Sequence, residues 1–424
     1  MSGKWPARAS RVVAVVLAAL VVPAAAAAQE RPKAPSLARP AAAILIDARD
    51  GSVMLSKDPR ERRAIASTTK LMTALLAVEM AEPTEVFTAP AYAASPVESK
   101  INLRKGEQMR VDDLLEALLL ESANDAAVTI AEGVSGTRKR FVAAMNGRAR
   151  SIGLEDTSYA NPIGLDDPLN YSTAADLAVL ARRLLRDARL ARIVNQPSAV
   201  LESGARRRVV NNRNDLIARF PFVDGVKTGH TRSAGNVLVG AATAPLGARV
   251  ISVVLGEPSQ AARDADTLSL LRYGLAQFRR EKALDAERAV ASASIKYRDE
   301  RAKLVPAQDF LLVVRRGERV TTRVRAPEEL EGDLPAGERV GRVAVLRDGK
   351  VVRRIPLVTA GEVPGAGPLR VVAHELGTFF LLLVLLGAVV LATFLIASVR
   401  SRRRTKELAE RRRERQRARS RAEG

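Results

Sequence analysis

The sequence contains no cysteine and only two histidines, His230 and His374. Without cysteine the chain can form neither disulfide bonds nor thiolate metal sites. Two histidines are too few for a zinc site of the usual kind, and no cluster of carboxylates that could replace them is evident in the sequence. We therefore expect a protein that uses neither a metal ion nor a cofactor.

The charge of the chain is strongly positive, at +21, which raises the question of a nucleic-acid partner. The charge is concentrated at the ends: residues 400–424 contain twelve basic residues and four glutamates, and Lys4, Arg8 and Arg11 lie near the N-terminus. With 47% hydrophobic and 27% charged residues, the composition is typical of a packed protein of about two or three globular units. We expect no nucleic acid as a partner.

Long hydrophobic runs are few, and the first of them predicts export. An apolar run from Val12 to Val22 follows the basic N-terminal residues and leads to Ala26 and Ala28 in an A-x-A arrangement. This is the pattern of a secretory signal peptide over residues 1–28, cut after Ala28. An uncleaved anchor helix is the alternative for this alanine-rich stretch, and in either case the domain that follows is exported.

The second hydrophobic run predicts a membrane anchor. Residues 377–399 carry no charge and are followed at once by RSRRR, and about 20 apolar residues suffice to cross a bilayer. Because positive charge stays on the cytoplasmic side, we expect residues 400–424 to form a cytoplasmic tail and residues of about 29–376 to lie outside the membrane. The lack of cysteine is compatible with a bacterial cell envelope. We interpret the basic tail as a lipid-attracted flank, with a nucleic-acid or protein partner as the alternative.

The exported part is predicted to contain an α+β domain followed by a small all-β domain. Two strands joined by a turn at Asp50-Gly51 come first, helices follow, and strands return in GVKTGHT, GNVLVGAATA and ARVISVVLG, before a final helix over Ala261–Arg279. Strands at both ends favour one shared antiparallel sheet. The expected boundaries are a Pro-rich leader (29–40), the α+β domain (41–285), the β domain (288–362) and a linker (363–376).

Ser67 and Lys70 lie three positions apart in IASTTKLMTALLAVEM, residues 65–80, so on a helix the amine can reach the hydroxyl. A serine needs a base to become nucleophilic, and two histidines leave few ways to build a Ser-His-Asp triad. A lysine can serve if burial and a second cation lower its pKa, and the all-round apolar helix supplies the burial. About one Ser-x-x-Lys is expected by chance in such a chain, so a helix cap followed by a snorkelling lysine stays open.

Two further fragments carry polar side chains suited to a cleft. ESAND places Ser122 and Asn124 at a break between two apolar helices. VDGVKTGHT places Lys227, Thr228 and Gly229 on an expected strand, where alternation puts the lysine and the glycine on one face and the glycine leaves room for a substrate backbone. Taken singly, the first is an ordinary loop and the second an edge strand with a solvated lysine.

In this order and at these separations, the three motifs resemble the signature of penicillin-recognising serine enzymes. From about Ala41 to Phe278, including YSTAADLA and VVNNRNDLI, the chain looks like the low-molecular-weight D-alanyl-D-alanine carboxypeptidases, and the β module after residue 288 is similar to that family's C-terminal domain. The resemblance implies a penicillin-binding, β-lactamase-like transpeptidase fold. It also implies removal of the C-terminal D-alanine from peptidoglycan stem pentapeptides through a serine acyl-enzyme, and acylation by β-lactam antibiotics.

The resemblance further implies roles for individual residues. Ser67 would attack the carbonyl between the two D-alanines, with Lys70 as its base and Ser122 relaying protons toward the leaving amine. Asn124 would bind the substrate's peptide backbone and steady Lys70. Lys227 would be the second cation that lowers the pKa of Lys70.

The remaining implied roles concern substrate binding. Lys227 and Thr228 would meet the terminal carboxylate beside Gly229, and the backbone N–H groups of Ser67 and His230 would form the oxyanion hole. Arg213 and Arg263 match positions at which the family places arginines near the cleft. A surface salt bridge is the alternative for each of these arginines.

Two departures from the family pattern and two competing functions remain. Ala123 stands where glycine is common, and a full membrane span replaces the usual amphipathic surface helix.

A class A β-lactamase shares all three motifs but needs a glutamate that directs water onto the acyl-enzyme, whereas PIGLDDPLN offers Asp166 and Asp167. A non-catalytic penicillin sensor is the other alternative, and the oligomeric state is open.

Overall fold

The computed structural model describes residues 32–422, and the expected signal peptide lies outside these described residues. The chain forms two compact units. One extends to residue 281 and also includes residues 312–318, whereas the other contains residues 282–311 and the chain from residue 319 onward.

The first unit is built on a five-stranded antiparallel sheet with the strand order β2-β1-β11-β10-β9. In this sheet Ile44 of the first strand lies opposite Val253 of β11, so the strands from the two ends of the domain share one sheet, as predicted. Gly51 forms the turn between the first two strands with a positive φ of 82°. The strands are β1 (Ala42–Asp47), β2 (Val53–Lys57), β9 (Val223–Thr231), β10 (Gly235–Thr243) and β11 (Arg249–Glu257).

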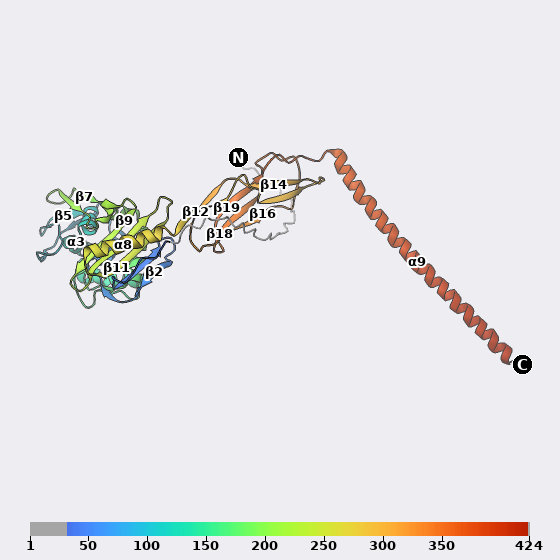
Figure 1. The fold of residues 1–424 in the computed structure, drawn as a ribbon, viewed down its shortest axis with the longest axis horizontal. Helices are drawn as coiled ribbons and strands as arrows, with labels where there is room; N and C mark the ends of the chain where they lie inside the picture. The colour runs from blue at the N-terminus through green and yellow to red at the C-terminus, as the bar shows by residue number, and fades with distance from the viewer. Residues whose placement is uncertain (1–31, 423–424) are drawn as a thin grey trace. The chain divides into compact units, whose positions relative to one another are not determined.

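Both faces of the sheet are covered, and the alternation of side chains in β1 shows how. Ile44 and Ile46 pack into the larger core, which the helices between β2 and β9 supply. Leu45 points to the other face and packs with Leu270 and Leu271 of α8. Helix α8 packs on strands β11 and β10 of the sheet, and Figure 1 shows α8 lying over the strands. The predicted α+β domain, with its strands in one antiparallel sheet, is therefore confirmed.

Most helices lie where the sequence predicts them, and Thr173 caps one of them by accepting a hydrogen bond from Asp176 N. The last predicted helix is wrong at its end: α8 stops at Leu275, and Phe278 already begins a strand whose polar residues RREK mimic a helix. The helices are α1 (Lys70–Met80), α2 (Val111–Glu116), α3 (Asn124–Ser135), α4 (Arg138–Ser151), α5 (Ala174–Leu184), α6 (Ala188–Val194), α7 (Leu216–Arg219) and α8 (Gln260–Leu275).

Three short two-stranded ladders, which the sequence analysis does not predict, connect the helices. They hold loops in place around the helical core rather than extending the main sheet. The pairs are β3 (Arg63–Ala64) with β6 (Tyr171–Ser172), β4 (Val86–Thr88) with β5 (Gln108–Arg110), and β7 (Ser198–Leu201) with β8 (Arg208–Asn211).

The second unit contains the predicted β domain, a six-stranded sheet with the order β16-β18-β19-β14-β13-β17. Asp348 and Gly349 form the expected tight turn between β18 and β19. The strands of this sheet are β13 (Ala291–Ile295), β14 (Arg301–Pro306), β16 (Val320–Arg325), β17 (Glu329–Leu330), β18 (Arg339–Arg347) and β19 (Lys350–Thr359). A separate two-stranded pair, β12 (Phe278–Leu284) with β15 (Phe310–Arg315), has residues in the ranges of both units.

The C-terminal helix α9 runs from Pro368 to Ala422. Among the described residues it is the one helix that is long and apolar enough to cross a membrane. It begins within the segment expected as a linker, so residues 368–376 are helical. Its length and apolar composition fit a membrane anchor.

Candidate active site

Ser67 lies on a tight 3₁₀ turn, Ala66–Thr69, that leads directly into α1, rather than on the α-helix itself. Ala66 has a positive φ of 47°, which sets the direction of this turn. Lys70 is the first residue of α1, and its Nζ lies 3.0 Å from Ser67 Oγ. The two groups are thus close enough for proton transfer.

Lys70 is completely buried in the described structure. Its Nζ donates a hydrogen bond to the carbonyl oxygen of Ile163 at 2.5 Å. Burial, and after it the positive charge of Lys227, lowers the pKa of Lys70 well below its ordinary value of 10.5. An amine in this environment is available as a neutral base.

The carbonyl of Ile163 belongs to a turn that one asparagine organises. Asn161 Oδ1 accepts hydrogen bonds from the backbone N–H groups of Ile163 at 3.2 Å, Gly164 at 2.6 Å and Leu165 at 3.2 Å. Gly164 has a φ of +88° and packs on the carbonyl of Ala66. Lys70 therefore lies between the turn that contains Ile163 and the turn that carries Ser67, and these two turns are in contact.

Ser122 and Asn124 lie where the helix α2 ends in a π-helical turn, Ala117–Glu121. Ser122 has a positive φ of 64°, which breaks the helix, and Asn124 starts α3. Their exposed fractions are only 6% and 5%. The predicted break between two apolar helices is present.

Lys227, Thr228 and Gly229 lie on β9, which runs directly against the turn that carries Ser67. A Cβ on Gly229 would lie 3.0 Å from the backbone nitrogen of Ser67, so the glycine allows this close approach. Lys227 is buried, and burial together with the charges of Arg213 and Arg263 lowers its pKa to about 7. The first and third motifs therefore lie side by side, and the two helical elements that flank Ser122 pack on α1, the helix that Lys70 starts.

The remaining predicted residues surround this centre less closely. His230 follows Gly229 at the exposed end of β9. Arg213 forms an ion pair with Glu121, and Arg263 is buried and pairs with Asp264 at 2.7 Å. The surface salt bridge foreseen as the alternative is thus present for Arg213, whereas the ion pair of Arg263 is buried. Both charges act on Lys227.

Three residues that contact the motifs are absent from the sequence-based site. Ile163 accepts from Lys70, Glu98 Oε2 accepts from Asn124 Nδ2 at 2.6 Å, and Asp125 accepts backbone hydrogen bonds from residues 101 and 103. Asp125 is the last letter of ESAND and could have been noticed as a cap of its loop. Ile163 and Glu98 carry no such signal, because they come from distant loops.

A pocket of about 510 Å³ lies beside the end of β9. Asp166, which lines it, accepts a hydrogen bond from Thr231 Oγ1 at 2.6 Å. Its neighbour Asp167 accepts from the backbone of Leu169 at 2.8 Å. Each of the two aspartates considered for a β-lactamase is therefore engaged outside the Ser67–Lys70 pair. The lining residues are Arg62, Arg63, Ala64, Asp166, Asp167, Pro168, Asn170, Tyr171 and Ser233.

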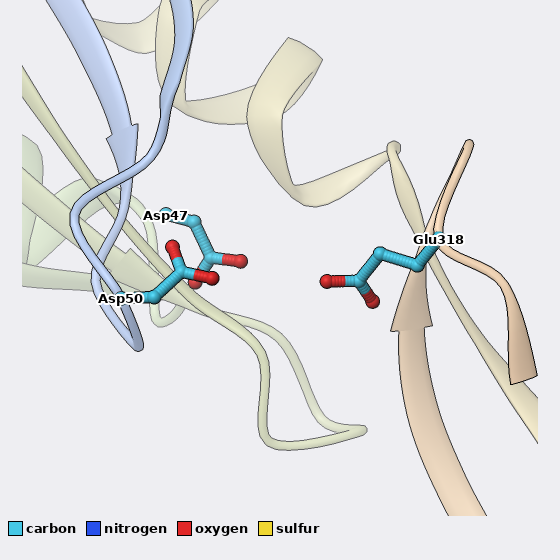
Figure 2. Close-up of side chains that lie close together, drawn as sticks. All are labelled: Asp47, Asp50 and Glu318. Carbon is cyan, nitrogen blue, oxygen red and sulfur yellow. The ribbon is translucent and has the colours of Figure 1, made fainter. Parts of the chain in front are cut away.

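A separate group of three carboxylates could in principle hold a cation. Figure 2 shows Asp47, Asp50 and Glu318 pointing toward one another. However, the guanidinium of Arg49 lies among them, 3.0 Å from Asp47 Oδ2 and 3.4 Å from Asp50 Oδ2, and forms an ion pair with Glu318. Because the guanidinium of Arg49 pairs with all three acids, the cluster is explained as an ion-pair network.

Comparisons with known proteins agree with this architecture. The family model described as D-alanyl-D-alanine carboxypeptidase matches residues 28–259, and the model of the penicillin-binding protein 5 C-terminal domain matches residues 278–365. The chain is 30% identical to D-alanyl-D-alanine carboxypeptidase DacF of Bacillus subtilis, over 84% of this chain and 94% of the relative. It is 32% identical to DacA of Haemophilus influenzae, over 76% and 85%.

Solved structures show the same similarity. The structure of penicillin binding protein 5 from Haemophilus influenzae superposes with a TM-score of 0.56 at 30% identity, covering 78% of this chain and 99% of that one. The D-alanyl-D-alanine carboxypeptidase DacD of Francisella tularensis gives a TM-score of 0.56 at 26% identity, covering 80% and 96%.

The fold and the three converging motifs define a serine enzyme of the penicillin-recognising class. Within that class, the chain belongs to the low-molecular-weight penicillin-binding proteins, the serine D-alanyl-D-alanine carboxypeptidases.

Proposed function

We propose that this carboxypeptidase removes the C-terminal D-alanine of peptidoglycan stem pentapeptides with Ser67 as its nucleophile. The observation that carries the proposal is the buried Lys70 amine, 3.0 Å from Ser67 Oγ, with a pKa lowered by burial and by Lys227. A neutral amine at that distance can take the hydroxyl proton as the oxygen attacks.

In the proposed reaction, Ser67 Oγ forms a bond to the carbonyl carbon between the two D-alanines while Lys70 takes its proton. The negative charge on the former carbonyl oxygen is held by the backbone N–H groups of Ser67 and His230. When the tetrahedral intermediate collapses, the C–N bond breaks and the free D-alanine leaves with a proton relayed through Ser122. Water then cleaves the acyl-enzyme ester and restores Ser67.

Substrate binding is assigned to the motif on β9 and to Asn124. Lys227 and Thr228 would bind the terminal carboxylate, with the backbone of the peptide lying along Gly229 and against Asn124. The near-neutral pKa of Lys227 would rise when an anionic carboxylate binds next to it, because an opposite charge favours the protonated amine. Arg213 and Arg263 add positive charge on the same side.

Two observations favour this function over the alternatives. A class A β-lactamase requires a carboxylate that directs water to the acyl-enzyme, and Asp166 and Asp167 are engaged by Thr231 and the Leu169 backbone. The relatives that the chain matches over most of its length are named D-alanyl-D-alanine carboxypeptidases, which favours hydrolysis over a membrane sensor.

The orientation in the membrane is part of the proposal. The apolar segment at 377–399 lies within α9 and is followed by the basic residues of the tail. By the rule that positive charge stays inside, the tail is cytoplasmic and the catalytic unit acts on the outer side, where the cell wall lies.

The decisive experiment compares the full-length protein with Ser67→Ala in two assays. These assays are covalent labelling by a fluorescent penicillin and release of D-alanine from a pentapeptide. The wild type should do both and the variant neither. Continued release by the variant would disprove the assignment, and labelling of the wild type without any release would favour the sensor.

A further inference from the structure

Glu98 lies in the segment between β4 and β5 and contacts the second motif directly. Its Oε2 accepts a hydrogen bond from Asn124 Nδ2 at 2.6 Å and another from the hydroxyl of Tyr92. Its Oε1 accepts from the backbone N–H of Ser95 at 2.9 Å. The carboxylate is therefore held by three donors at the edge of the site.

The segment that carries Glu98 is itself fixed to α3. Asp125, which is 5% exposed, accepts backbone hydrogen bonds from Ile101 at 3.1 Å and Leu103 at 2.9 Å. The backbone N–H of Asn124 donates to Ser99 O at 2.8 Å, one residue after Glu98. Glu98 is thus placed by a backbone that is bonded to the same helix that starts at Asn124.

The contact constrains the side-chain amide of Asn124. An ionised carboxylate only accepts hydrogen bonds, so it selects the NH₂ end of the amide and rejects the oxygen end. With one N–H committed to Glu98, the directions of the second N–H and of Oδ1 are also determined. These are the two groups that Asn124 has left for a substrate or for Lys70.

Glu98 also contributes to the charge balance at Lys70. Three charged groups act on that amine from the elements packed around it: Lys227 from β9, Glu98 from the segment before β5, and Asp125 from α3. After burial, Lys227 lowers the pKa of Lys70, whereas Glu98 and Asp125 raise it.

The carboxylate keeps its charge at neutral pH. Partial burial opposes ionisation, but the hydrogen bonds from Tyr92 and Asn124, together with the charge of Lys100, lower the pKa of Glu98 below its ordinary value. Asp125 is committed to two backbone N–H groups, so Glu98 is the acid whose removal changes both the amide and the charge.

We propose that Glu98 is a positioning residue of this enzyme, which orients the amide of Asn124 and offsets the charge of Lys227 at Lys70. This inference rests on the proposed function, since it assumes that Lys70 is the base and that Asn124 binds substrate. It adds a residue from outside the three motifs to the machinery of the site.

Glu98→Gln tests both parts, because glutamine keeps the size of the side chain but can donate as well as accept. In the full-length protein, the plateau rate of acylation by a fluorescent penicillin should fall roughly ten- to a hundredfold, the range for losing a charged hydrogen bond. The acid limb of the pH–rate profile should move to lower pH, because the lost negative charge lowers the pKa of Lys70.

Two further variants separate the contributions. Tyr92→Phe removes one hydrogen bond but keeps the carboxylate, so it should slow acylation without moving the acid limb. Glu202→Gln removes an exposed acid that pairs with Arg207 on the surface and should match the wild type in both respects. Thermal unfolding of all variants shows whether any loss of rate comes from a loss of folded protein.

Wild-type rates and an unmoved acid limb in Glu98→Gln would overturn the inference. A slower but equally stable Glu98→Gln protein with an unmoved acid limb would overturn the charge balance. Should Glu98→Gln fail to fold, wild-type acylation by Tyr92→Phe would overturn the positioning role. Failure of the proposed function itself is distinguishable, because the unmodified protein would then release no D-alanine, whatever the Glu98→Gln variant does.

Discussion

Gly164 packs against the backbone carbonyl of Ala66, the residue that precedes Ser67. A Cβ on Gly164 would lie 2.0 Å from that oxygen, a distance that no side chain can adopt without moving the backbone. The contact joins the turn that accepts the hydrogen bond of Lys70 to the turn that carries Ser67. Gly164 therefore fixes the position of the Ile163 carbonyl relative to Ser67, and these are the two groups to which Lys70 is hydrogen-bonded.

Gly164→Ala should therefore damage both stability and activity. The positive φ and the clash together should cost about 3 kcal/mol of the free energy of unfolding, and acylation should slow because the backbone near Ile163 must shift. Urea unfolding and penicillin labelling measure the two effects. Gly153→Ala is the matched control: its φ is +78° but nothing lies within 4 Å of the added atom, so about 1 kcal/mol is expected. Equal losses in both variants would contradict the role of the contact.

Lys227 should govern the pH dependence of acylation. The positive charge of Lys227 disfavours the protonated form of Lys70, so replacing Lys227 by glutamine should raise the pKa of Lys70. A larger share of Lys70 is then protonated at neutral pH, and the acid limb of the acylation profile should move to higher pH. Lys227→Arg keeps the charge and should leave the limb in place, whatever it does to substrate binding. An unmoved limb in the glutamine variant would remove Lys227 from the activation of the base.

Arg208 and Glu107 form a buried ion pair at 2.7 Å, with side-chain exposures of 8% and 2%. Arg208→Met should lower the free energy of unfolding by about 3 kcal/mol, because it leaves the glutamate buried without its partner. The neighbouring variant Arg207→Met breaks an exposed pair with Glu202 and should cost less than about 1 kcal/mol. Urea unfolding of the two variants gives the comparison, and similar costs would contradict the expectation.

The pH dependence of this pair has a defined sign. Partial burial opposes the ionisation of Glu107, but hydrogen bonds and the charge of Arg208 lower the pKa of this carboxyl below its ordinary value of 4.5. A lowered folded-state pKa means that the stabilisation is complete above pH 4.5 and is lost as the pH falls through the lowered value. The difference between wild type and Arg208→Met should therefore shrink in acid.

The absence of native cysteine allows the membrane orientation to be tested with single cysteines. Glu287→Cys places a thiol before the β domain, and Ser401→Cys places one just after the apolar segment. In intact spheroplasts a membrane-impermeant maleimide should label the first and not the second, whereas permeabilised cells should give both labels. Labelling of Ser401→Cys in intact spheroplasts would reverse the proposed topology.

Much of the architecture is predictable because its signals are local. The apolar run of β1, the glycine at the Asp50-Gly51 turn and the all-round apolar sequence of α1 each report on a few neighbouring residues. The three motifs are also local, and their order along the chain is enough to indicate the family. Burial of Lys70 follows from the apolar helix that it starts.

What the sequence does not reveal is which distant backbone and side-chain groups complete the site. Ile163 acts through a carbonyl oxygen that every residue has, and it lies 93 positions from Lys70. Glu98 looks like an ordinary loop glutamate until the bonds of Asp125 bring its segment to α3. The strand β12 is missed because its polar residues have helix propensity and only its pairing with β15 favours a strand.

The pairing of β1 with β11 has a consequence for how the molecule is made. The partner of β1 follows roughly two hundred residues later in the chain, and pairing between such distant strands forms slowly during folding. A chain that is threaded through a membrane from its N-terminus cannot complete this sheet until residue 257 has emerged on the far side. We therefore expect the unfinished unit to be vulnerable to envelope proteases during secretion, and to become resistant in a single step once its last strand arrives.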